Sequence, residues 1–243
     1  MDSDLLRERF AVVLARPSHP GNIGAAARAL KTMGFADLLL VEPRHFPDPD
    51  ATAMAAGAAD VLEHARVYTA LDAALADRVL AVGFSARGRD LSHGTQALRD
   101  AAPAILEAAA RGPVALVFGN ETSGLSNEEL SRCQRLVSVP ANPAYSSLNL
   151  AAAVQVACYE IAVCAAAFEP SASKAGEPAT REDAEGFFAQ LEATALGSGF
   201  VDPANPGRFM ERMRRLFARG GLEREEVKLL RGLMNVCATR RPK

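Results

Sequence analysis

The chain has 243 residues, 49% of them hydrophobic and 23% charged, which is enough for one sizeable globular domain and a smaller appendage. The net charge of −2 argues against a uniformly basic nucleic-acid binder. The most apolar stretch, residues 148–168, is rich in alanine and is interrupted by Asn149, Gln155 and Glu160, so it predicts a buried helix and not a membrane span.

The N-terminus and the cysteines indicate the compartment of the protein and the absence of disulfide and zinc sites. The first ten residues, MDSDLLRERF, have neither the basic start nor the apolar core of a signal peptide, so we expect a cytoplasmic protein. The four cysteines form no C-x-x-C pair and have no histidine at ligand spacing. We therefore expect buried apolar cysteines, with neither a disulfide framework nor a zinc site.

The first 168 residues alternate strand-like and helix-like segments. Residues 9–17 are an apolar, β-branched run that ends at Pro17, and residues 22–34 are an alanine-rich helical segment that ends at Gly34. Further strands are expected at 37–43, 78–85, 113–119 and 136–140, and further helical segments at 51–63, 71–77, 98–110 and 148–168. Strands separated by helices predict βαβ crossovers, and hence a parallel sheet with helices on both faces.

The composition changes after residue 168. Residues 169–181 are rich in Pro, Ser, Ala and Gly, which predicts a linker, and helices are expected at 182–196, 208–219 and 222–237. Residues 207–243 hold 11 Lys and Arg against 4 Asp and Glu, a net charge of +7, which leaves −9 on the remaining 206 residues. This asymmetry indicates a localised anionic partner, although a solvated basic helix would have the same pattern.

Three strand-to-helix junctions hold the candidate functional residues, because ligands of open parallel sheets bind beyond the carboxyl ends of the strands. In the first junction, residues 19–34, Asn22 is expected to cap the helix and Gly24 to allow a close backbone approach. Arg28 stands alone among apolar neighbours, where it either serves a ligand or pairs with a nearby carboxylate. The G-N-I-G run is not a dinucleotide fingerprint, which argues against a nicotinamide oxidoreductase.

The second and third junctions are rich in polar groups. In residues 114–130 an apolar strand ends at Gly119, with Asn120 and Glu121 at its tip, and the S-N-E-E run at 126–129 predicts a capped helix start. In residues 139–160, two prolines stiffen a loop before Ser146 and Ser147, which are expected to cap the next helix, and Asn149 is expected in its first turn. These groups either hold a small ligand or serve only as caps.

The three junctions resemble motifs 1, 2 and 3 of the SPOUT superfamily of methyltransferases. Motif 1 is N-x-G-x-x-x-R, motif 2 is the strand followed by G-N-E, and motif 3 is the loop that ends in S-L-N. More narrowly, A-N-P-A-Y-S-S-L-N-L-A-A-A-V-Q, G-L-S-N-E-E-L and F-V-D-P-A-N-P-G-R-F-M-E-R-M-R-R-L-F-A-R resemble the TrmJ family, and the likeness spans nearly the whole chain. TrmJ enzymes are homodimers that 2′-O-methylate nucleotide 32 of tRNA, a cytidine or uridine in bacterial members.

The resemblance implies a fold and a set of site residues. It implies an α/β SPOUT domain at residues 1–168 with a C-terminal trefoil knot, a linker at 169–181 and a small helical, basic, tRNA-binding domain at 182–243. It implies that S-adenosylmethionine contacts Phe84, Ser85, Ala86, Gly119, Val139, Ser146, Ser147 and Leu148. It implies catalytic or orienting roles for Arg28, Asn22, Glu121, Ser147 and Asn149.

The chain departs from its relatives at two places. TrmJ relatives often read G-R-E-R-x-G-L in motif 2, whereas Asn120 and Thr122 replace the two arginines here, and Phe84 stands where a small hydroxyl residue is common. These departures alter the expected RNA contacts and leave the reaction type intact. Because arginine is normally locked in its protonated form, Arg28 is expected to orient the ribose and to stabilise developing oxyanion charge. No metal is expected, since a sulfonium already carries an activated methyl group.

The C-terminal helices are expected to bind RNA. At about 100° per residue, Arg208, Arg212, Arg215 and Arg219 share one helix face that can follow phosphates, while Phe209, Met213, Leu216 and Phe217 are expected to face the core. Two other functions stay open: the same chemistry on another RNA such as ribosomal RNA, and a non-catalytic RNA-binding protein. The apolar 148–168 helix also predicts a homodimer, because one copy does not bury every face of it.

Overall fold

The computed structural model describes residues 3–86, 95–170, 176–203, 207–218 and 221–239. The chain divides into two compact units, Met1–Ser171 and Ala172–Lys243. Each unit has a hydrophobic core of its own. Arg219, one of the four expected RNA-binding arginines, lies outside the described residues.

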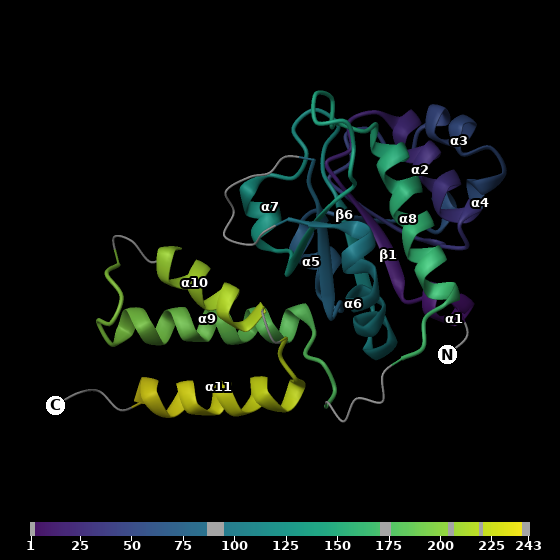
Figure 1. Cartoon of the computed structure of the whole chain (residues 1–243). Coiled ribbons are helices and arrows are strands. Elements are labelled where there is room, and N and C mark those ends of the chain that lie inside the picture. The colour runs from purple at the N-terminus through teal and green to yellow at the C-terminus, as the bar shows by residue number, and fades with distance from the viewer. Residues whose placement is uncertain (1–2, 87–94, 171–175, 204–206, 219–220, 240–243) are drawn as a thin grey trace. The chain divides into compact units, whose positions relative to one another are not determined.

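A parallel β-sheet forms the centre of the first unit (Figure 1). Its strands, counted over the described residues, are β1 (Phe10–Ala15), β2 (Asp37–Val41), β3 (Arg66–Tyr68), β4 (Leu80–Phe84), β5 (Gln96–Ala97), β6 (Val114–Phe118) and β7 (Arg135–Ser138). The strand order is β3-β2-β1-β6-β4-β7-β5, and each neighbouring pair is parallel. All the strands therefore end at one edge, and the predicted α/β class is confirmed. The trefoil knot stays a prediction.

Helices cover both faces of this sheet. They are α1 (Ser3–Arg7), α2 (Pro20–Thr32), α3 (Pro49–Ala55), the 3-10 turn η1 (Ala56–Ala58), α4 (Ala59–Glu63), α5 (Leu71–Leu75), α6 (Leu98–Arg111), α7 (Asn127–Ser131) and α8 (Leu150–Ala166). Helices α2, α6 and α8 share the larger core on one face, and α5 and α7 pack on the other. Figure 1 shows α8 beside α2, and the two helices are in contact.

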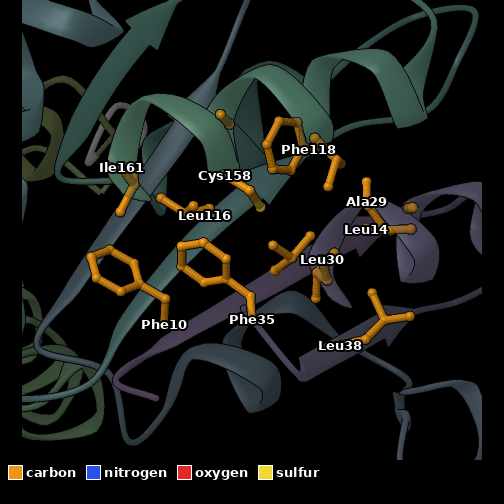
Figure 2. Packing of buried hydrophobic residues seen from close by; sticks show 14 of the residues in the cluster. Phe10, Leu14, Ala29, Leu30, Phe35, Leu38, Leu116, Phe118, Cys158 and Ile161 are labelled. Atoms are coloured by element: carbon orange, nitrogen blue, oxygen red, sulfur yellow. The ribbon is translucent and has the colours of Figure 1, made fainter. Parts of the chain in front are cut away.

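The larger core lies between the sheet and helices α2 and α8. Figure 2 shows Phe10 and Leu14 of β1 and Leu116 and Phe118 of β6 pointing toward these helices. Residues Leu30 of α2 and Cys158 and Ile161 of α8 close this layer, and all three are fully buried. Burial raises the pKa of the Cys158 thiol to about 12, so this cysteine is a neutral packing group, as expected.

Two short strands and one helix were not predicted. Strand β3 has three residues, β5 has two, and both lie at the edges of the sheet, so neither shows an apolar alternation. The expected helical segment 51–63 is broken: Ala56 has a φ of 49°, which ends α3 and starts η1. The N-terminal helix α1 is only five residues long.

The second unit consists of helices α9 (Arg181–Gly197), α10 (Gly207–Ala218) and α11 (Arg224–Thr239). Its core includes Phe187, Phe188, Met210 and Val227, with Phe209 and Phe217 packed against them. Residues 177 and 179 of the expected linker hydrogen-bond with Arg224 and Leu222, so this end of the segment is part of the second unit. None of the helices in the described ranges is long and apolar enough to cross a membrane.

Gly24 allows the close approach between α2 and α3. A Cβ placed on Gly24 would lie 2.0 Å from the Ala51 carbonyl oxygen, so the close backbone approach expected at this glycine is to a neighbouring helix. We expect Gly24→Ala to lower the free energy of unfolding by about 1–3 kcal/mol or more, because two helix backbones must separate. Urea denaturation of the purified protein measures this.

Gly21→Ala is the matched control in the same helix. Its Cβ would meet only Met54 Cγ at 3.6 Å, an ordinary contact, and alanine favours the helix. We expect Gly21→Ala to be neutral or slightly stabilising. Equal unfolding curves for the two variants would contradict the role assigned to Gly24.

Candidate active site

The loops that follow β1, β6 and β7 meet at the carboxyl edge of the sheet, and Glu121 connects the loop after β6 to the loop after β1. Its carboxylate accepts hydrogen bonds from the backbone N–H and the hydroxyl of Ser18, at 2.9 and 2.7 Å, and from the His19 N–H at 3.1 Å. The Asn22 side-chain amide donates a fourth bond at 3.0 Å. Glu121 of motif 2 therefore fixes the start of the helix that carries motif 1.

These hydrogen bonds also determine the charge of Glu121. Burial raises the pKa of its carboxyl group, but the bonds from Asn22 and Ser18 together outweigh burial and lower the pKa to about 2. Glu121 is thus ionised at neutral pH, and a carboxylate with so low a pKa is a weak proton acceptor. The stability that it contributes is present above its ordinary pKa of 4.5 and is lost as the pH falls toward 2.

Asn149 joins motif 3 to the same cluster. Its amide nitrogen donates to Asn22 Oδ1 at 3.0 Å, and its Oδ1 accepts from the backbone N–H groups of Ala151 and Ala152 at 2.9 and 3.3 Å. Asn149 is therefore the N-cap of α8. The prediction that Ser146 and Ser147 cap this helix was wrong, because the helix starts at Leu150 and leaves the serines in the preceding loop.

Asn22 is not a cap either. Helix α2 begins at Pro20, whose fixed φ suits the first helical position, and its N-cap is His19, which makes no side-chain capping bond. Asn22 therefore lies within the first turn. Its amide group is free to bridge Glu121 and Asn149, and it bonds to both.

A pocket lies beside this cluster, at the ends of β4, β6 and β7. Its lining includes all eight residues expected to contact the cofactor: Phe84, Ser85, Ala86, Gly119, Val139, Ser146, Ser147 and Leu148. Phe118, Leu150, Ala153 and residues 120–125 line it as well. Sequence reasoning missed Phe118, although it is paired with Phe84 by the register of β4 and β6, in which Gly83 lies opposite Val117.

The pocket has an apolar floor and a polar rim. The rings of Phe84 and Phe118 stack with centroids 4.2 Å apart and an interplanar angle of 17°. Ser85, Ser146 and Ser147 line the more exposed rim, and Ser146 Oγ donates to the Ala86 carbonyl at 3.5 Å. Phe84, which stands where a small hydroxyl residue is common in relatives, therefore adds a second aromatic ring to the floor of the pocket.

The loop of residues 119–126 forms one wall of the pocket, and we call it the motif 2 loop. A Cβ at Gly119 would lie 2.1 Å from the carbonyl carbon of Gly124 and from the nitrogen of Leu125, so only glycine permits this fold of the loop. Asn120 organises it from within: its Oδ1 accepts from Thr122 N at 2.9 Å, and its amide donates to the Arg16 carbonyl at 2.8 Å. The predicted capping box of Ser126 and Glu129 is present and starts α7.

Arg28 is not brought to this pocket. It is exposed on α2, it does not line the pocket, and its guanidinium has no hydrogen-bond or ion-pair partner in the part of the chain that the structure describes. The alternative of an ion pair with a neighbouring carboxylate is thus not realised within those residues. Arg28 shares the outward face of α2 with Gly21, Ala25 and Thr32, at the spacing of one helix face.

The expected RNA-binding face lies on α10 of the second unit. Arg208 and Arg212 are exposed and Arg215 is half-buried. The core-facing stripe differs from the prediction, because Leu216 is 54% exposed whereas Met210 is buried. The neighbouring Arg214 is half-buried, pairs with Glu185 and lies over the ring of Phe188.

Comparisons with known proteins identify relatives of both units. Residues 9–159 match the model of the SpoU rRNA Methylase family, and residues 182–242 match the tRNA methyltransferase TrmJ C-terminal domain. The chain is 44% identical over 238 residues to the tRNA (cytidine/uridine/adenosine-2'-O-)-methyltransferase TrmJ of Pseudomonas aeruginosa, which covers 93% of both chains.

Solved structures of methyltransferases share this fold. The crystal structure of TrmJ from Z. mobilis ZM4 superposes with a TM-score of 0.81 at 31% identity, over 93% of this chain and 97% of that one. The SpoU methyltransferase AviRb from Streptomyces viridochromogenes, solved in complex with AdoMet, has a TM-score of 0.54 at 25% identity, over 66% of this chain and 62% of that one.

Proposed function

The chain belongs to the SpoU rRNA methylase family and to its TrmJ branch, and from this premise we propose that it methylates the ribose 2′-OH of nucleotide 32 in the tRNA anticodon loop. The methyl donor is S-adenosylmethionine, the nucleotide a cytidine or uridine, and the place of action the cytoplasm. The observation that carries the proposal is the chain of contacts from Glu121 through Asn22 to Asn149, which ties all three motifs together beside one pocket.

The pocket fits the proposed cofactor. Its stacked floor of Phe84 and Phe118 suits an adenine ring or an apolar stem, and its serine hydroxyls and backbone groups suit the ribose and amino-acid ends. When bound, S-adenosylmethionine supplies a methyl group activated by a sulfonium. The protein's own part is to hold the donor, to orient the ribose and to exclude water.

Glu121, Arg28 and Ser147 have different roles toward the ribose 2′-hydroxyl that accepts the methyl group. A ribose hydroxyl is a poor nucleophile, so its attack requires polarisation or deprotonation. Glu121 is ionised and bonded to the backbone and side chains of the motif 1 loop, so its role is to shape the site. The guanidinium of Arg28 stabilises negative charge that develops on the 2′-oxygen. Ser147 lines the pocket, and we assign its hydroxyl a hydrogen bond to the methyl donor or to the ribose.

A homodimer would bring Arg28 to a pocket. Helix α8 presents an exposed or half-buried stripe of Ala152, Val156, Tyr159, Val163 and Ala166, all apolar and spaced by four and three residues. Such a stripe is typical of a helix that packs against a second helix. Since α2 is in contact with α8, a second copy packed on α8 would also lie near α2, which carries Arg28 as an exposed residue. We therefore propose that a second copy covers α8 and that Arg28 serves the partner's pocket.

The dimer surface has a direct test in a matched pair of variants. Val163, 52% exposed on α8, and Val67, 55% exposed on β3, are equally accessible valines on different surfaces of the first unit. We expect Val163→Glu to give a monomer, because two buried carboxylates would face each other, and Val67→Glu to leave the mass unchanged. Light scattering measures both. A dimer of Val163→Glu, or a monomeric wild type, would overturn the proposed surface.

The reaction itself is tested with purified protein, S-adenosylmethionine and unmodified transcripts. Anticodon-loop substrates with C, U, A or G at position 32, and a ribosomal RNA fragment, are digested and analysed by mass spectrometry. The proposal predicts a 2′-O-methyl group on nucleotide 32 of the tRNA transcripts with C or U. Methylation of the ribosomal fragment alone would favour the same chemistry on another RNA. Binding of tRNA with no methyl transfer would favour the non-catalytic alternative.

A further inference from the structure

Arg16 occupies an unusual backbone position next to the pocket. It follows β1 directly and has a φ of 55°, a left-handed conformation that residues other than glycine rarely adopt. Its N–H donates to the Val41 carbonyl at the end of β2, at 2.7 Å, so the neighbouring strand fixes it in this conformation. Residues held in such conformations cluster at functional sites, because the surrounding structure must maintain them.

The side chain of Arg16 holds the far end of the motif 2 loop. Its Nε and Nη2 donate to the two carboxylate oxygens of Glu129, at 2.8 and 2.6 Å. Glu129 also accepts a hydrogen bond from Ser126 N at 2.6 Å and so closes the cap of α7. Burial raises the pKa of Glu129, but the bonds from Arg16 and Ser126 lower it overall, so the pair is ionised.

The main chain of Arg16 holds the near end of the same loop. Its carbonyl accepts the Asn120 amide at 2.8 Å, while Asn120 Oδ1 accepts the N–H of Thr122. One residue thus contacts the motif 2 loop at its start, through Asn120, and just past its end, through Glu129. Residues 121–125 between these contacts line the pocket.

We propose that Arg16 is a positioning residue that holds the motif 2 loop in the shape that binds the cofactor. The inference rests on the proposed function, because it takes S-adenosylmethionine as the ligand of the pocket. A merely stabilising ion pair is the competing explanation. Partly exposed pairs contribute little to stability, and a left-handed arginine is costly, so stability alone is a weak reason for this arrangement.

Four variants separate the two explanations. Arg16→Gly removes the side chain and also relieves the backbone, whereas Arg16→Ala removes the side chain and keeps the strain. Glu129→Gln removes the charge but keeps an acceptor for Ser126. Arg99→Ala is the control: Arg99 and Glu160 form an equivalent two-bond pair, at 2.9 and 2.6 Å, between α6 and α8 and outside the pocket lining.

Calorimetry with S-adenosylmethionine, and amide hydrogen exchange of the unliganded protein, give the readouts. We expect Arg16→Gly and Glu129→Gln to bind S-adenosylmethionine about tenfold more weakly and to exchange the Thr122, Ser123 and Gly124 amides faster, with little loss of thermal stability in Arg16→Gly. Arg16→Ala should show the same loss of affinity with a lower melting temperature. Arg99→Ala should match the wild type in affinity and in exchange of this loop.

Wild-type affinity and exchange in Arg16→Gly and Glu129→Gln would overturn the proposal. So would a lower melting temperature in either variant without a change in affinity and exchange, since that is the behaviour of a stabilising pair. A wild-type protein that does not bind S-adenosylmethionine would contradict the proposed function instead. The exchange rates of the motif 2 loop would then still decide whether Arg16 holds it.

Discussion

Replacing Arg28 by alanine is expected to lower the single-turnover rate of methyl transfer by about 10²–10³-fold, the usual cost of losing a group that stabilises an oxyanion. The fold and the affinity for S-adenosylmethionine should be unchanged, because Arg28 is exposed and does not line the pocket. Arg28→Lys keeps the charge but not the planar fork of donors, so an intermediate rate is expected. A wild-type rate in Arg28→Ala would remove this residue from the mechanism.

Mixed dimers reveal which pocket Arg28 serves. Ala86 is exposed at the rim of the pocket, so Ala86→Trp should block the cofactor without disturbing the core. Each variant alone should have at most about a hundredth of the wild-type activity. If Arg28 acts across the dimer, an equal mixture of Arg28→Ala and Ala86→Trp, denatured and refolded together, should recover about a quarter of the wild-type activity, because half of the dimers hold one complete site. No recovery, with mixed dimers formed, would place Arg28 beside its own pocket.

Neutralising the basic face of α10 should have the second large effect, on tRNA affinity. The first unit, Met1–Ser171, carries 14 Lys and Arg against 19 Asp and Glu, a net charge of −5, so it does not attract phosphates overall. We expect Arg208→Gln, Arg212→Gln and Arg215→Gln together to weaken tRNA binding. The log–log salt dependence should also flatten by about 0.7–0.9 for each phosphate that is no longer neutralised by an arginine.

Lysine substitutions at the same three positions are the matched control. They keep the charge, so affinity and salt slope should stay near the wild-type values if the arginines only follow phosphates. Affinity for S-adenosylmethionine should be unchanged in both sets, because the pocket is built from residues of the first unit. Equal tRNA affinity and salt slope in the glutamine and wild-type proteins would mean that this face is only solvated surface.

The sequence was most informative where apolar runs are long. The expected strands at 9–17, 37–43 and 113–119 correspond to β1, β2 and β6, because buried strands of a parallel sheet are apolar on both faces. The short edge strands β3 and β5 bury little and have no such pattern. Pairing order also depends on contacts between distant segments, which no local pattern records.

At the candidate site, the sequence identified the residues that line the pocket, but it did not predict which groups their side chains contact. The eight expected cofactor residues line one pocket. The capping roles expected for Asn22, Ser146 and Ser147 were wrong, because a capping role requires the exact first residue of the helix, and the N-caps are His19 and Asn149. The link from Arg16 to Glu129 spans 113 positions. Spacing in the sequence does not reveal a contact of this kind.

Mapping 2′-O-methyl groups in tRNA from cells that lack this gene tests the central claim most directly. We predict that the modification at nucleotide 32 is absent from these cells, that the wild-type gene restores it, and that Arg28→Ala, produced at the same level, does not. An unchanged modification at nucleotide 32 in cells without the gene, or its full restoration by Arg28→Ala, would contradict the proposed function.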